Sequence, residues 1–176
     1  IKSAIGEVKS SAVLGVILAI VVLFVFLRRM GTTLIVSLAI PISIVATFNL
    51  MFFNGLSLNI MTLGGLALGA GMLVDNAIVV IESIFRNQEK GLSIKEAAIN
   101  GTAEVANAVI ASTLTTIVVF LPIVYLHGAS GELFKDQAWT VTFSLVSSLF
   151  VAILVIPMLY IQLSGKKVKL EEVKSI

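Results

Sequence analysis

The chain has 176 residues, of which 58% are hydrophobic and 12% charged, with a formal net charge of +2 and a mean hydropathy of +1.09. This composition excludes a soluble globular domain and predicts an all-α integral membrane protein whose partner is the lipid bilayer, with no nucleic-acid partner. Because there is no cysteine and only one histidine, His127, disulfides, thiolate metal sites and catalytic triads are excluded, and no cofactor is expected.

Residues 1–10 lack the basic-then-apolar order of a signal peptide, so they look like the end of something larger. The orientation and the resemblance given below make them an extracytoplasmic linker. The chain begins with Ile1 rather than methionine, so we treat it as a fragment that could belong to a longer protein. The transmembrane domain is predicted over 11–164.

Within that domain the uncharged block from Met30 to Val74 has 45 residues, about twice what one helix needs to cross the hydrocarbon core. It must therefore turn back once, and the turn dipeptide Asn54-Gly55 marks the place, with Asn59 as the polar start of the next helix. Three other uncharged blocks complete a predicted five-helix bundle. The predicted spans are about 11–28, 32–52, 59–84, 104–126 and 138–163.

Between the third and fourth spans, 85–103 is predicted as a cytoplasmic loop, in which the capping-box spacing Ser93 to Glu96 indicates the start of a helix. Pro41, inside the second span, should bend it because proline lacks an amide donor. The polar segment 165–176 is predicted as a cytoplasmic tail, either frayed or the start of an interfacial helix.

Lysine and arginine predict the orientation, since they are retained on the cytoplasmic side of a membrane. With five spans, nine of the twelve basic residues fall on one side and three on the other. The three are Lys2, Lys9 and Lys135. The amino terminus is therefore predicted outside and the carboxyl terminus inside.

Asp75 is the only charged residue in the 22-residue run from Ile60 to Ile81. An ionised aspartate at the centre of a membrane helix costs about 2.5–3.5 kcal/mol, so such residues usually face protein or water and have a function. Proton transfer is the function that this pattern favours, with Asp75 and its neighbour Asn76 as candidate relay residues. The alternative is a structural acid that only joins helices through hydrogen bonds.

Helical geometry places Asp75 on a stripe with Gly64, Gly71 and Glu82, while Gly65, Gly69 and Asn76 share a second stripe. Small residues let helices approach closely, and Gly65-x-x-x-Gly69 has the spacing typical of such contacts. The four glycines are therefore predicted as packing residues, and Asp75 is expected to be enclosed by helices on two sides.

Glu82, about two turns beyond Asp75, is an interfacial residue or a cytoplasmic proton exit. On the fourth span Thr113, Thr115 and Thr116 are interpreted as helix contacts. His127 is predicted in a solvated outer loop. No lysine or arginine lies in the interior of any predicted span, since Arg28 is at the very end of the first, so a counter-charge for Asp75 must come from elsewhere.

The string GMLVDNAIVVIESIFR, from Gly71 to Arg86, closely resembles the fourth transmembrane helix of resistance-nodulation-division efflux pumps. The preceding PISIVATFNLMFFNGLSLNIMTLGGLALGAG and the later FLPIVYLHGASGELFKD and LVIPML resemble the neighbouring segments in order and spacing. The resemblance covers nearly the whole chain and corresponds to spans two to six of the amino-terminal half.

This resemblance implies a proton-driven transporter of the bacterial inner membrane, not an enzyme. Pumps of the family are usually homotrimers with twelve spans in two halves and large porter domains, and a lysine of the second half pairs with the acid. The porter domain and the carboxyl-terminal half would be the missing partners of this chain, which is not expected to transport alone. Asn76 stands where many pumps for amphiphiles carry a second acid.

The sequence thus predicts the proton-relay portion of an efflux transporter for amphiphilic compounds, with protons as the coupling ion. Heavy-metal members often keep one acid followed by a small residue, so a heavy-metal pump is an alternative. A non-transport module of the sterol-sensing or translocation-accessory type, or an inactive helical bundle, is a further alternative.

Overall fold

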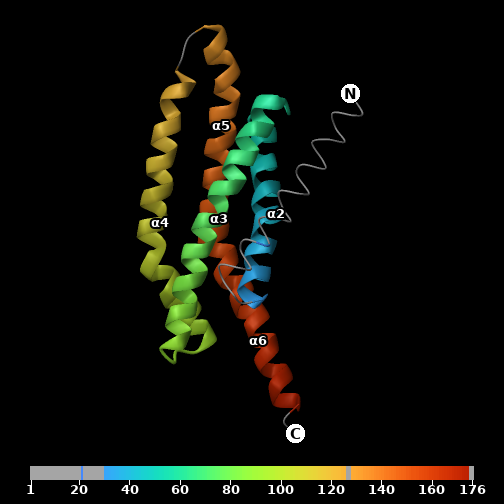
Figure 1. Cartoon of the computed structure of the whole chain (residues 1–176), viewed down its shortest axis with the longest axis vertical. Coiled ribbons are helices and arrows are strands. Elements are labelled where there is room, and N and C mark those ends of the chain that lie inside the picture. The colour runs from blue at the N-terminus through green and yellow to red at the C-terminus, as the bar shows by residue number, and fades with distance from the viewer. Residues whose placement is uncertain (1–20, 22–29, 126–127, 175–176) are drawn as a thin grey trace.

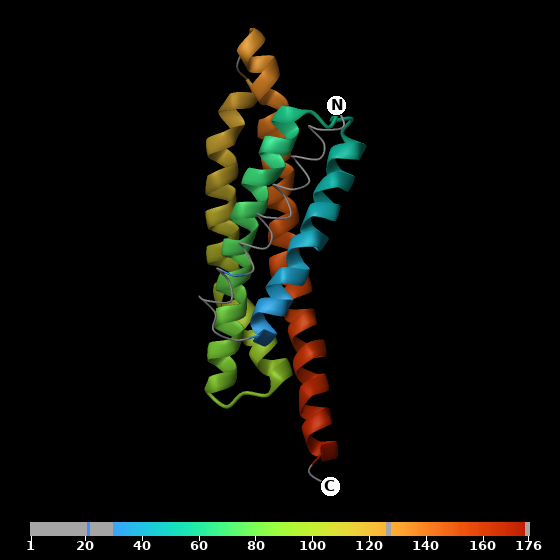
Figure 2. The same ribbon diagram turned by 45° about the vertical axis from the view of Figure 1, so that its right-hand side comes forward.

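The computed structural model describes residues 21, 30–125 and 128–174, and every regular element among them is helical (Figure 1). The elements are α2 (Met30–Phe53), α3 (Ile60–Glu89), α4 (Ile94–Val124), α5 (Ala129–Phe150), the π-helical turn η1 (Val151–Val155) and α6 (Ile156–Lys174). The last three follow one another without a break and form a single long rod. The α3–α4 turn and the end of α6 lie at one end of the bundle, and the α2–α3 turn lies at the other (Figure 2).

Four helical stretches in the described part of the chain are long and apolar enough to cross a membrane. They are Gly31–Phe53, Ile60–Glu89, Ile94–Val124 and Phe134–Gly165. The predicted class, an all-α membrane bundle, is confirmed. The predicted first span, 11–28, and the linker 1–10 lie outside the described residues apart from Val21, so the count of five remains a prediction.

The turn between α2 and α3 falls at Asn54-Gly55, as predicted, and Gly55 has the positive φ of 69° that favours glycine. Asn59 caps α3 reciprocally with Thr62. The Asn59 side-chain oxygen accepts from the Thr62 amide at 2.9 Å, and the Thr62 hydroxyl accepts from the Asn59 amide at 2.8 Å. The predicted polar start of this helix is therefore confirmed.

The connection between α3 and α4 is much shorter than the predicted loop 85–103, because α3 continues to Glu89 and α4 begins at Ile94. The predicted capping box is confirmed and starts α4 ten residues before the predicted membrane span. The Ser93 hydroxyl accepts from the Glu96 amide at 3.3 Å, and a Glu96 carboxylate oxygen accepts from the Ser93 amide at 3.2 Å. The helix ends in this hairpin therefore lie beyond the predicted span ends, and the apolar core and polar flank of each arm belong to one continuous helix.

The two arms of the hairpin touch closely near this turn. A Cβ placed on Gly101 would stand 2.5 Å from the Cα of Ile84, so α4 lies directly on the backbone of α3. One carboxylate oxygen of Glu104 accepts from the side-chain amide of Asn87 at 2.9 Å and from the Ser83 hydroxyl at 3.4 Å. Shape and hydrogen bonding together fix α3 against α4 at this end.

The rod from α5 to α6 begins earlier than the predicted span 138–163, after Gly128, whose φ is +97°. Within it the amide of Ile156 donates to the carbonyl of Val151, five residues back, which is the π pattern. Pro157 follows at once, and since a proline ring clashes with the carbonyl four residues earlier, a widened turn there makes room for it. The predicted tail 165–176 has a helical backbone as far as Lys174.

The apolar core lies between α2, α3 and the η1–α6 part of the rod. Val36, Ile81, Ile84 and Ile156 are fully buried there. Pro41 lies on the exposed side of α2, which is continuous through it, and the expected bend stays a prediction. At the same end as the α3–α4 turn, the hydroxyl of Tyr160 donates to the side-chain oxygen of Gln88, joining α6 to α3.

Candidate functional site

Asp75 lies in the middle of α3 on the exposed surface of the bundle. The expectation that helices of this chain enclose it on two sides is wrong for the described residues. Glu82 is also exposed, and no heavy atom lies within 4 Å of where a Cβ of Gly71 would stand in the described structure. We call this side of α3, carrying Gly71, Asp75 and Glu82, the acid face.

Asp75 is exposed because α3 packs against α5 through its other stripe of small residues, the one that carries Gly65 and Gly69. A Cβ on Gly65 would stand 2.9 Å from the carbonyl oxygen of Gln137, and one on Gly69 would stand 2.6 Å from the hydroxyl oxygen of Ser144. A Cβ on Gly64, at the edge of this contact, would only meet the side-chain nitrogen of Gln137 at 4.0 Å. The contact with α5 therefore runs along Gly65 and Gly69 and turns the acid face outward.

Asn76 continues the packed stripe and reaches two helices. Its side-chain amide donates to the hydroxyl of Thr113 on α4 at 3.2 Å and to the hydroxyl of Ser148 on α5 at 3.4 Å. Both hydroxyl-bearing residues are buried, with 2% and 1% of their surfaces exposed. We call Asn76, Thr113 and Ser148 the polar seam. The two adjacent residues of the predicted relay thus point in different directions, Asp75 outward and Asn76 inward.

Of the three threonines predicted as helix contacts, one bonds to another helix and two bond only within α4. Thr113 joins the polar seam, whereas Thr115 and Thr116 donate to carbonyls of their own helix, those of Ala111 and Ser112. His127, predicted in the outer loop, lies outside the described residues.

Ser148 was missed by sequence reasoning. A signal for it exists, because Thr140, Ser144 and Ser148 recur every four residues and form a polar, small-residue stripe on α5. That stripe meets the Gly65, Gly69 and Asn76 stripe of α3. The two stripes match in size and polarity, so considering them together predicts that Ser148 lies beside Asn76.

The chemistry open to this arrangement follows from its side chains. Amide and hydroxyl groups do not titrate in the physiological range, so the polar seam holds helices together without changing charge. Asp75 is the only residue between Ile60 and Ile81 that can lose or gain charge.

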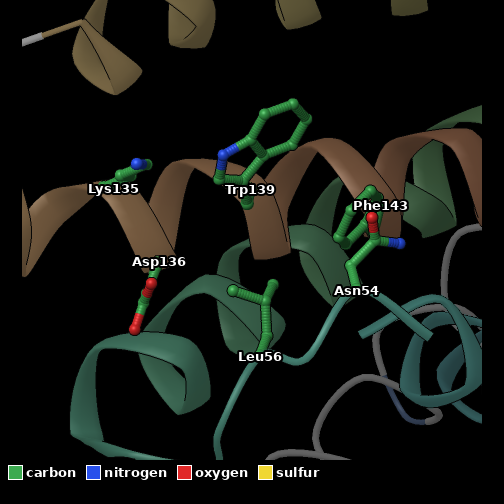
Figure 3. A pocket seen from close by; sticks show the side chains of 6 residues that line it. All are labelled: Asn54, Leu56, Lys135, Asp136, Trp139 and Phe143. Atoms are coloured by element: carbon green, nitrogen blue, oxygen red, sulfur yellow. The ribbon is translucent and has the colours of Figure 1, made fainter. Parts of the chain in front are cut away.

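A second feature lies at the opposite end of the bundle from the α3–α4 turn. A surface cavity of about 570 Å³ opens between the α2–α3 turn and the start of α5, and is lined by Asn54, Leu56, Lys135, Asp136, Trp139 and Phe143 (Figure 3). The Asp136 carboxylate accepts a hydrogen bond from the side-chain amide of Asn59 at 3.2 Å, and the rings of Trp139 and Phe143 stack with their centroids 5.6 Å apart. Lysine and tryptophan at the end of a membrane-length helix are typical of a membrane surface.

The chain matches a known protein family over nearly its whole length. The family model described as the AcrB/AcrD/AcrF family matches residues 1–172. The chain belongs to this family. The resemblance to resistance-nodulation-division pumps that the motif around Asp75 predicted is therefore confirmed.

Individual members of the family show the same relationship. The chain is 38% identical over 159 residues to proteins named multidrug resistance protein MdtC from Pectobacterium atrosepticum, Escherichia coli and Yersinia pestis. The aligned part is 90% of this chain and 16% of each relative. The chain thus spans about 16% of the length of the relatives that it matches. The names of these relatives do not favour the sterol-sensing, translocation or heavy-metal alternatives.

Proposed function

We propose that this chain is the proton-relay portion of a proton-driven efflux transporter that exports amphiphilic compounds from the bacterial inner membrane. Asp75 binds a proton from the outer side and releases it toward the cytoplasm, and Asn76 belongs to the same relay site. Family membership and the multidrug resistance names of the relatives support an efflux transporter.

The observation that carries the proposal is the placement of Asp75, a single acid at the middle of a membrane-length helix on an open, glycine-flanked face. In contact with lipid, an ionised aspartate there would cost about 2.5–3.5 kcal/mol. A further protein surface or a water-filled space must therefore cover the acid face. In the proposed transporter that surface belongs to the carboxyl-terminal half and supplies the cation that pairs with Asp75.

Protonation would remove the charge from the acid face and so change the affinity of α3 for the surface opposite. That change is the step that drives movement of the porter domain in a homotrimeric pump. The orientation has the amino terminus outside and the carboxyl terminus inside. The α3–α4 turn then faces the cytoplasm, and Glu82, two turns from Asp75 on the same face, lies on the path by which the proton leaves.

The test is proton-dependent efflux of an amphiphilic dye by cells expressing the complete transporter that carries this chain. Asp75→Asn keeps the size of the side chain but cannot exchange a proton, and it should abolish efflux while the protein remains in the membrane at normal amounts. Glu82→Gln, the matched change two turns away, tests the proposed exit path and should slow efflux without abolishing it. Intact proton-coupled efflux in Asp75→Asn would refute the proposal.

A further inference from the structure

The polar seam differs from an ordinary helix contact because one side chain joins three helices. Asn76 donates one hydrogen bond to Thr113 on α4 and one to Ser148 on α5. A bond to a single neighbour would leave α3 able to pivot around that contact. Bonds to two neighbours from one amide determine the rotation of α3 about its own axis at this level.

This rotation determines where Asp75 points, because successive residues on a helix differ by about 100° in direction. With Asn76 held between Thr113 and Ser148, Asp75 is directed to the acid face. About two turns away, Gly69 lies directly against Ser144, so that α3 and α5 are in close contact there as well. The seam and the glycine contact together leave Asp75 a single direction.

We infer that Asn76 is a positioning residue for Asp75: it aligns the carboxyl group with the cation opposite and carries no proton itself. This inference rests on the proposed function. It also explains why an amide suits position 76. An ionised aspartate in the seam would bury a second charge between Thr113 and Ser148, whereas an amide provides two donors and stays neutral at every pH.

The surroundings make the effect of Asn76 on Asp75 measurable. No charged residue occurs in 30–53, 105–124 or 137–165, so α2, α4 and the α5–α6 rod present no titrating carboxylate or cation at the depth of Asp75. Along α3 the next charged residue toward the cytoplasm is Glu82. A change in the titration of Asp75 can therefore be attributed to its own alignment.

The experiment is infrared titration of the Asp75 carboxyl band in the complete transporter, with the band identified by its loss in Asp75→Asn. Thr113→Val removes one partner of Asn76 at nearly constant volume, and Asn76→Ala removes both bonds. Thr115→Val is the matched control, since Thr115 is exposed and bonds only to the Ala111 carbonyl of its own helix. Thr113→Ser keeps the hydroxyl and serves as the rescue variant.

Misalignment changes the pairing of the carboxylate with its cation, so the titration midpoint of Asp75 should move. We expect a larger shift in Asn76→Ala, which removes both bonds, than in Thr113→Val, which removes one. The pH dependence of efflux should move with it. Thr115→Val and Thr113→Ser should titrate as the parent does.

Each outcome decides between the two proposals. If Asp75 titrates in the parent but Thr113→Val and Asn76→Ala leave its midpoint in place, the positioning role is wrong and the relay proposal stands. A loss of folded protein without a shift in midpoint would show that the seam is only structural, and would also overturn the inference. If the Asp75 band does not titrate in the parent at all, the proposed function itself fails.

Discussion

Gly69 is the position where the structure leaves least room for a side chain on α3. In Gly69→Ala the added methyl group would overlap the side chain of Ser144, whose hydroxyl oxygen is 2.6 Å from the new carbon, so α3 and α5 must separate or tilt. Overpacking of this kind costs about 1–3 kcal/mol. Alanine also favours the helix over glycine by up to about 1 kcal/mol, which offsets part of that loss.

Gly71→Ala isolates the packing cost, because it makes the same change two residues away where no atom of the described structure lies within 4 Å of the new carbon. The helix-propensity gain is common to both variants. Thermal unfolding of the chain in mild detergent, followed by circular dichroism, should therefore place Gly69→Ala below Gly71→Ala by about 1–3 kcal/mol. Ser144→Gly should restore part of the loss, since it removes the group that the methyl strikes. Equal stability of the two alanine variants would refute the close α3–α5 contact.

Two further predictions concern the α3–α4 hairpin. Gly101→Ala should destabilise the chain by about 2 kcal/mol or more, because its methyl group would stand 2.5 Å from the backbone of Ile84, and backbone cannot move aside as a side chain can. Unfolding in detergent measures this loss, and an unchanged stability would contradict the backbone contact. Ser93→Ala should lower the stability of the chain by about 1 kcal/mol because it removes the cap of α4, whereas Ser93→Thr keeps the hydroxyl and should lower it little. Amide hydrogen exchange at 94–97 should become faster only in the alanine variant.

The elements whose cause is local could be predicted from the sequence. The Asn54-Gly55 turn and the Ser93 capping box are each determined by a few adjacent residues, and both occur where predicted. The helix ends beyond the hydrocarbon core were predicted less well. Hydropathy indicates where the hydrocarbon core of the membrane ends, but a helix ends where its hydrogen bonding and its cap terminate it. For this reason α3 continues to Glu89 through Arg86, Gln88 and Glu89, which are good helix formers.

The direction of Asp75 could not be predicted from α3 alone. Both stripes of this helix carry two glycines, so either could have packed against a neighbour. The choice depends on α5, where Thr140, Ser144 and Ser148 present a small polar surface that accepts Gly65, Gly69 and Asn76. The pattern of α3 alone therefore does not indicate which of its two stripes is buried. That choice depends on both helices of the pair.

The two contacts of α3 limit how protonation of Asp75 could produce movement. At the cytoplasmic end of the proposed orientation, Gly101 and Glu104 hold α4 against α3, and at mid-helix Asn76 holds both α4 and α5. Rotating α3 alone would break all of these contacts together. The acid face, by contrast, has no partner among the described residues that movement would disrupt. If Asp75 is the proton carrier, α3, α4 and α5 should therefore move as one body against the surface that covers the acid face. Crosslinks between α3 and α5 should then leave transport intact, and crosslinks across the acid face should stop it.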